Sequence, residues 1–336
     1  MTKSKHRYWT LVFMVPTVLL IVVAWNSQWV ETYVCTTSGQ CNKHKDIYFR
    51  RLHHWKEIYF SNTEHSPSKS LSSSFGHVRN ETDLIIVFFA VPKTGSRSVS
   101  NPFNMLYTST DRMYQIVPAE DRVSSESLTS YLTKMPPATF VRGHFPIVNL
   151  PRNYVPISVL RDPLERFISE FNFVKHGDGQ IGTERIKIHD QPEFELSIDE
   201  CVRRKGLFCS RESVATYTLK FFCGYDPKCA VANEWTYKQA VDNVEDKFLM
   251  VGITEDLNST MELIEILLPN MSKGVVSIYH EKQKLKRGTY ITHRTENPSP
   301  RIRARLRKMM YWEYKFYHHV KMKFSSLKKQ FGLPER

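Results

Sequence analysis

The sequence predicts an α/β fold in which a central parallel sheet is flanked by helices. Three apolar runs, at residues 84–90, 155–160 and 248–253, have the β-prone composition of strands that are buried on both faces. Segments patterned as helices alternate with these runs, and such alternation is typical of a parallel sheet. The chain has 336 residues. About 255 of them follow its amino-terminal segment, which is enough for one domain with a sizeable core.

The first of these runs leads into a polar turn, Val91 to Ser98, which contains hydroxyl-bearing, small and basic residues. We expect a helix after it. A strand, a small-residue turn and a helix N-terminus place several backbone N–H groups around an anion, and Lys93 adds a positive charge. The turn therefore predicts a phosphate or sulfate site, with an ordinary polar connection as the alternative. The P-loop of nucleoside triphosphatases is excluded, because its G-x-x-x-x-G-K-[ST] pattern is absent.

The second run ends at Arg161, where a helix begins. Asp162 suits the N-cap, Pro163 suits the first helical position, and Glu165 predicts a capping box. Ser169 lies two turns further on, on the face of the cap. Arg161 and Ser169 could together hold a second phosphate, and a plain capped helix with a surface arginine is the alternative.

Four segments are predicted as helices: residues 162–175, 235–246, 255–268 and 301–324. The last segment carries apolar residues on roughly one stripe. These are Ile302, Leu306, Met310, Tyr317, Val320 and Phe324.

The amino-terminal segment predicts a membrane anchor. Residues 1–8 form a basic tail, and residues 9–25 form an apolar run near the lower length limit for a spanning helix. The basic residues before the run favour a cytosolic amino terminus, and a cleaved signal peptide is the alternative. Residues 26–80 are predicted as a stem and residues 81–336 as the folded domain.

Charge and cysteines agree with a lumenal domain. The net charge is +13, which favours polyanionic partners, and the predicted anchor argues against nucleic acid. Six cysteines in a secretory chain suggest disulfides, and close spacing suggests Cys201–Cys209 and Cys223–Cys229. Cys35 and Cys41 could pair locally or between chains. A zinc site is disfavoured because no C-x-x-C occurs, and we expect no metal. Sequons at Asn80, Asn258 and Asn270 are candidate glycosylation sites.

Two motifs together resemble a known family. PKTGS at residues 92–96 and VLRDPLERFIS at residues 159–169 are similar to the nucleotide-binding segments of sulfotransferases that use 3′-phosphoadenosine 5′-phosphosulfate (PAPS). The resemblance extends over residues 81–336 to the uronosyl 2-O-sulfotransferases of glycosaminoglycan synthesis. Its later segments are FNFVKHGD, DECV, FFCG, FLMVGITEDL and PSP. The carboxyl-terminal region looks closest to the chondroitin/dermatan uronyl branch.

The resemblance implies a sulfotransferase-type, P-loop-like fold and a role for each matching residue. His144 would be the general base, and Lys93 would steady the bridging oxygen as sulfate departs. Thr94, Gly95, Ser96 and Arg97 would hold the 5′-phosphate side of PAPS, and Arg161 and Ser169 its 3′-phosphate. The enzyme would be a single-pass type II protein of the Golgi membrane with a lumenal catalytic domain, and relatives form homotrimers.

The acceptor implied by the resemblance is a glycosaminoglycan. Arg142 and a basic loop from Lys282 to Arg294 are the candidate acceptor contacts, in particular Lys284, Lys286, Arg287 and Arg294, with a solvated charge run as the alternative. Ala90 stands where relatives carry an arginine that helps to hold the acceptor. A catalytically inactive glycan-binding protein that kept the fold is therefore the rival prediction. The choice between heparan and chondroitin/dermatan, and between iduronate and glucuronate, stays open.

Overall fold

The computed structural model describes residues 84–334 apart from 152, 178–195, 207 and 286–294, together with the backbone of four amino-terminal strands. Two compact units make up the chain, Met1–Pro67 and Ser68–Arg336.

In the first unit the described segments are strands, and the first two of them overlap residues 9–25, where the sequence predicted a spanning helix. They are β1 (Trp9–Val12), β2 (Leu20–Asn26), β3 (Trp29–Cys35) and β4 (Cys41–Lys43), paired antiparallel in that order. Valine, isoleucine and tryptophan favour strands, and Pro16 would interrupt a helix. Among the residues that the structure describes, no helix is long and apolar enough to cross a bilayer. The anchor at residues 9–25 stays a prediction.

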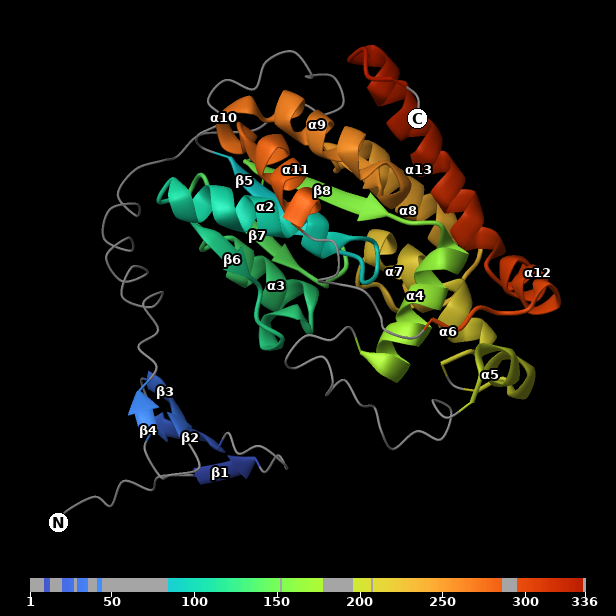
Figure 1. Cartoon of the computed structure of the whole chain (residues 1–336), viewed down its shortest axis with the longest axis horizontal. Coiled ribbons are helices and arrows are strands. Elements are labelled where there is room, and N and C mark those ends of the chain that lie inside the picture. Colours follow the sequence, from blue (N-terminus) through green and yellow to red (C-terminus); the bar gives the residue numbers. More distant parts are fainter. Residues whose placement is uncertain are drawn as a thin grey trace. The chain divides into compact units, whose positions relative to one another are not determined.

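The second unit is built on a five-stranded sheet in which every neighbouring pair is parallel (Figure 1). The strand order is β6-β7-β5-β8-β9. The strands are β5 (Ile85–Phe89), β6 (Tyr114–Ile116), β7 (Phe140–Gly143), β8 (Tyr154–Leu160) and β9 (Met250–Ile253). The three predicted strands are confirmed as β5, β8 and β9, and the predicted parallel sheet is confirmed with them.

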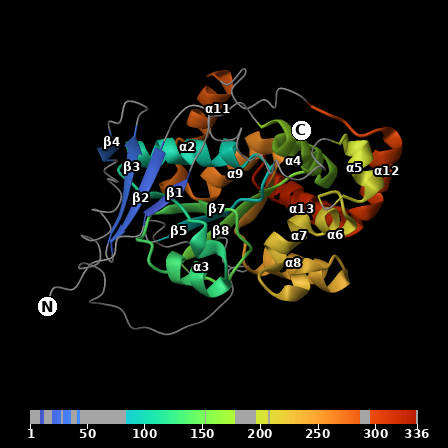
Figure 2. The ribbon, with the colours of Figure 1, turned by 90° about the horizontal axis from the view of Figure 1, so that it is seen from below.

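Helices flank this sheet on both sides. Figure 2 shows α2, α9 and α11 on one face and α3 and α8 on the other. The described helices are α2 (Ser96–Ser109), α3 (Ser125–Leu132), α4 (Pro163–His176), α5 (Ile198–Arg204), α6 (Arg211–Ala215), α7 (Tyr217–Cys223), α8 (Glu234–Asp246), α9 (Leu257–Leu267), α10 (Pro269–Ser272), α11 (Val275–Leu285), α12 (Pro300–Met309) and α13 (Tyr311–Gln330). Short 3-10 turns lie at Glu120–Arg122, Pro227–Ala230 and Thr254–Asp256.

The helix predicted at 301–324 is in fact two helices, because α12 ends at Met309 and α13 begins at Tyr311. The predicted stripe is buried, but it divides between two apolar clusters. Ile302, Leu306 and Met310 belong to a smaller cluster with α4 and α5. Tyr317, Val320 and Phe324 belong to the main core, which includes the strands of the sheet. The break lets one amphipathic segment serve two cores.

Helix caps show where tertiary contacts override the local pattern. The Asp162 carboxylate accepts from the N–H groups of Leu164 and Glu165, as predicted for an N-cap. The capping box is wrong, because Glu165 pairs instead with Arg303 at 2.9 Å. In a capping box the Glu165 carboxylate would accept from the Asp162 N–H. That N–H donates instead to Glu255 Oε1, at 2.8 Å.

Both predicted disulfides of this unit are present. Cys201–Cys209 joins α5 to the segment before α6, and Cys223–Cys229 joins the end of α7 to the following 3-10 turn. Cys35 and Cys41 are register partners across β3 and β4, and their side chains lie outside the described part.

Candidate active site

The loop between β5 and α2 is arranged to receive an anion. Gly95 is the N-cap of α2 in the left-handed region, at φ 79°, and no side chain caps the helix. Ser96 and Arg97 begin the helix, and its first turn contains no acidic residue. A helix N-terminus with uncapped amides and no nearby carboxylate carries partial positive charge. These amides are therefore free of the side-chain caps that other helices here use.

Two residues before Gly95 shape the same loop. Lys93 also lies in the left-handed region, at φ 67°, which is unusual for a residue with a side chain. Thr94 is fully buried, and its hydroxyl donates to the Val91 carbonyl at 2.9 Å. The Thr94 hydroxyl thus stabilises the turn from within. The backbone amides of the loop and the Lys93 side chain are then the groups that can bind an anion.

Arg161 lies beside this loop because β5 and β8 are adjacent and parallel. Its guanidinium NH1 donates to the Lys93 carbonyl at 3.3 Å. The two segments that the sequence singled out therefore meet at the carboxyl edge of the sheet, where ligands bind in open α/β folds. Ser169 lies half-buried in α4, two turns beyond the cap.

His144 follows β7, the neighbour of β5 on its other side. Its Nδ1 lies 2.6 Å from the carbonyl oxygen of Ala90. A carbonyl can only accept, so we assign the proton to Nδ1, which leaves Nε2 with a free lone pair. This is the tautomer that a general base needs.

The charge state of His144 fits the same role. Loss of solvation lowers its pKa, the Ala90 hydrogen bond opposes this, and the positive charges of Arg142 and Arg122 lower it further. The side chain is nevertheless exposed at the surface. An imidazole that is covered on one side and open on the other stays neutral and can still be reached from solvent.

Arg142 extends from the end of β7 toward α2. Its NH1 donates to the Ser100 hydroxyl at 2.5 Å, and its buried Nε has no hydrogen-bond partner. Ala90 itself is fully buried, so its contribution here is through its backbone: its N–H donates to the Gly143 carbonyl at 3.0 Å and its carbonyl receives His144.

Two further residues at this edge were not predicted. The Thr254 hydroxyl lies 2.7 Å from the Thr94 carbonyl and 2.8 Å from the Leu160 carbonyl, so it bridges the ends of both motifs. Phe173, on α4, lies under Lys93, whose Nζ is 3.8 Å from the ring centroid. Such an approach over an aromatic face attracts a cation.

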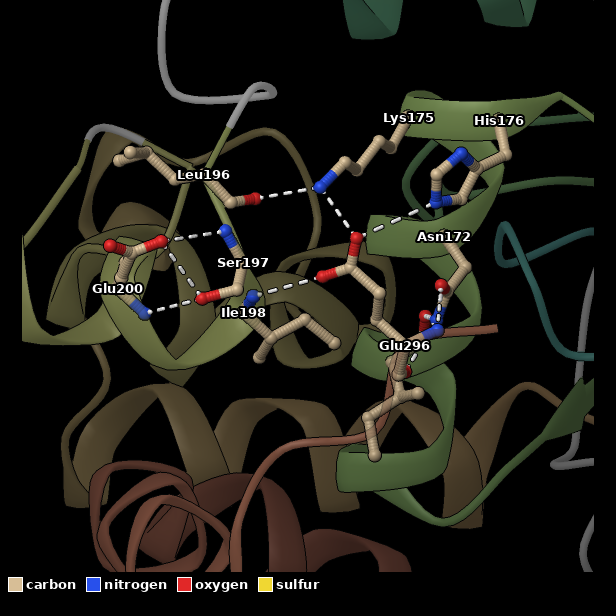
Figure 3. A network of polar contacts seen from close by, with 9 residues as sticks. Asn172, Lys175, His176, Leu196, Ser197, Ile198, Glu200 and Glu296 are labelled. Atoms are coloured by element: carbon tan, nitrogen blue, oxygen red, sulfur yellow. Dashed lines mark hydrogen bonds and ion pairs between the residues drawn. The ribbon is translucent and has the colours of Figure 1, made fainter. Parts of the chain in front are cut away.

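A polar network holds the part of α4 that carries Phe173 (Figure 3). Glu296 Oε1 lies 2.5 Å from Lys175 Nζ and 3.6 Å from His176 Nε2, and its Oε2 accepts from the Ile198 N–H at 3.3 Å. The Glu296 N–H also donates to Asn172 Oδ1 at 2.6 Å. The segment before α12 thus fixes the end of α4 and the start of α5.

The remaining candidates are spread more widely. Lys284 lies exposed in the last turn of α11, so this part of the predicted basic loop is helical. Lys286, Arg287, Arg294 and Asn80 lie outside the described residues. Asn258 lies half-buried in α9, and Asn270 is exposed in α10. Within the described ranges, no group of three or more His, Cys, Asp or Glu could hold a metal ion.

Comparison with known proteins identifies the fold family. The sequence profile described as "Sulfotransferase family" matches residues 76–319. The chain belongs to the sulfotransferase family. Human uronyl 2-sulfotransferase is 33% identical over 266 residues, which cover 74% of this chain and 64% of that protein. Heparan sulfate 2-O-sulfotransferase 1 of Xenopus laevis is 29% identical over 265 residues, covering 73% and 72%.

The match to the human uronyl enzyme therefore spans slightly less than two thirds of that protein. A solved structure of retinol dehydratase with androsterone and the inactive cofactor PAP aligns at a TM-score of 0.29 and 13% identity, over 89% of each chain. The predicted family is confirmed by the profile and by these sulfotransferase relatives.

Proposed function

We propose that this sulfotransferase-family chain transfers sulfate from PAPS to the 2-hydroxyl of a uronic acid in a glycosaminoglycan. One observation carries the proposal. The uncapped N-terminus of α2, the Lys93–Arg161 contact and a histidine with a free Nε2 meet at one edge of the sheet. The sulfotransferase relatives named above support the acceptor class.

PAPS supplies a sulfuryl group whose leaving group is 3′-phosphoadenosine 5′-phosphate. His144 Nε2 accepts the proton of the acceptor hydroxyl as its oxygen bonds to sulfur. Lys93 and the first amides of α2 stabilise the negative charge that grows on the departing phosphate oxygen. Arg161 lies where it can bind a second phosphate, which distinguishes PAPS from a simple adenosine phosphosulfate. These residues fit an anionic nucleotide because they provide fixed positive charge without an opposing carboxylate in the first turn of α2.

The test uses the purified full-length chain with radiolabelled PAPS and a panel of desulfated heparan, chondroitin and dermatan chains. We expect transfer to at least one of them. His144→Ala should lower turnover by roughly 10²–10⁴-fold while binding of 3′-phosphoadenosine 5′-phosphate survives. His280→Ala, at an exposed histidine of α11, is the matched control.

A glycan-binding protein without activity is the second candidate, because Ala90 leaves this edge without the arginine expected by resemblance. Transfer to none of the acceptors, with glycan binding retained, would favour it. The same assay identifies which polysaccharide and which uronic acid are used.

The cellular setting follows as part of the proposal. The basic tail and apolar run at residues 1–25 support a type II Golgi membrane protein, and the two disulfides agree with an oxidising lumen. Protection of the carboxyl-terminal domain from protease in sealed microsomes would check the orientation. Homotrimer formation stays a prediction for sedimentation analysis.

A further inference from the structure

The helix α12 carries a strongly basic face outside the candidate active site. Arg301, Arg305 and Lys308 are exposed and are spaced at i, i+4 and i+7, so they share one side of the helix. Within the described residues none of the three forms an ion pair. Like charges four residues apart repel and destabilise a helix. The face is therefore built at the expense of local stability.

The nearby acidic side chains bind other groups. Glu165 pairs with Arg303 at 2.9 Å, and Asp199 accepts from the Ser299 N–H at 2.9 Å. The Arg303–Glu165 pair fastens α12 to the first turn of α4, four residues beyond Arg161. The basic face thus belongs to an element fastened to α4, the helix that follows Arg161, and Figure 1 shows α12 at the same end of the domain as α4 and α5.

We propose that the face formed by Arg301, Arg305 and Lys308 is a docking surface for the anionic polysaccharide on which the acceptor uronate is carried. The proposal rests on the proposed function and deepens it. The surface lies apart from the catalytic edge and binds neighbouring units of the chain, so it favours long acceptors over short ones.

The burial of the apolar residues of α12 favours a polysaccharide over a membrane surface as the partner of this face. A helix that lies on a bilayer inserts an apolar face between the lipids. The apolar face of α12 is already buried, because Ile302 and Leu306 lie in the smaller core together with Met310, the residue that caps the helix. What α12 leaves exposed is charge with Ala304 between, and this suits a hydrated polyanion better than a lipid surface.

The test compares two full-length variants of equal charge. The first replaces Arg301, Arg305 and Lys308 with glutamine. The second replaces three scattered, exposed lysines, Lys134, Lys273 and Lys329, with glutamine. Each lowers the net charge from +13 to +10, since three positive charges are removed.

Affinity for long dermatan sulfate chains is measured by surface plasmon resonance over a salt series without PAPS. The α12 variant should bind on the order of tenfold more weakly. Its salt dependence should be shallower, because fewer charge contacts remain and fewer counterions are released on binding. The scattered variant should change about twofold or less. Sulfate transfer to a tetrasaccharide should stay at the wild-type rate in both.

Equal losses in the two variants would overturn the inference, since net charge alone would then explain binding. Binding to vesicles of phosphatidylserine and phosphatidylcholine is measured for the same variants. If the α12 variant loses affinity for the vesicles while its affinity for dermatan sulfate is unchanged, the face belongs to a membrane contact instead. Because binding is measured without turnover, a wild-type chain that transfers no sulfate would refute the proposed function and leave this comparison valid.

Discussion

Replacing Thr254 with valine should weaken nucleotide binding although Thr254 belongs to neither motif. Its hydroxyl lies 2.7 Å from the Thr94 carbonyl and 2.8 Å from the Leu160 carbonyl. The first carbonyl belongs to the loop before α2, and the second immediately precedes Arg161. Valine keeps the shape of the side chain and removes the donor, so the two anion-binding segments lose their shared contact.

The size of the effect follows from one hydrogen serving two acceptors. The hydroxyl makes one full hydrogen bond at a time, with a net worth of about 0.5–1.5 kcal/mol. A part-buried carbonyl left without its donor adds to this, so we expect a total of about 1–2 kcal/mol. If this whole free energy is lost from the binding-competent conformation of the loop, the affinity for 3′-phosphoadenosine 5′-phosphate should drop roughly 5–30-fold.

Calorimetric titration of the purified variant with 3′-phosphoadenosine 5′-phosphate measures this drop directly. Thr254→Ser keeps the hydroxyl and should bind close to wild type. A Thr254→Val protein that binds as tightly as wild type would refute the reasoning. A larger loss for serine than for valine would show that the methyl group, which lies against Gly95 and which valine keeps, matters instead.

Two further predictions concern stability and pH. Glu313 is buried, and its Oε1 accepts from the N–H groups of Thr218 and Leu219. Glu313→Ala should lower the free energy of unfolding by about 3–5 kcal/mol, because two buried donors lose their acceptor. Glu313→Gln keeps an oxygen there, and a melting temperature as low as that of the alanine variant would contradict this. The lowered pKa of His144 predicts that kcat is full at neutral pH and falls only as pH drops through a value below the usual ~6.5, because the protonated ring cannot accept a proton; a midpoint above ~6.5 in the pH–rate profile would count against the free-base assignment.

The sequence was sufficient for the elements with strong local patterns. The runs that became β5, β8 and β9 are almost continuously apolar, so their burial could be inferred before their partners were known. The strands β6 and β7 were missed because they have three and four residues, and β7 includes Arg142 and Gly143. Such short, mixed segments become strands only through pairing with a neighbour.

The same distinction holds at the candidate site. Parallel strands end at one edge, so the meeting of Lys93 and Arg161 could be expected from the two motifs. The bridge made by Thr254 could not be expected, because its two partners are distant in the sequence. Thr94 lies 160 positions before it and Leu160 lies 94 positions before it. The failed capping box has a similar cause: Glu165 found a better partner in Arg303 than in its own helix.

The division of the carboxyl-terminal segment between two cores has a consequence for biosynthesis. The ribosome makes α12 and α13 after every strand of the sheet, yet Leu306 is needed by the smaller core and Phe324 by the larger one. Neither core can close while this segment is still inside the exit tunnel. The nascent domain therefore presents unpaired apolar faces until α13 has emerged, and its final collapse must follow that emergence. Its yield in a cell should therefore depend on chaperones that shield those faces.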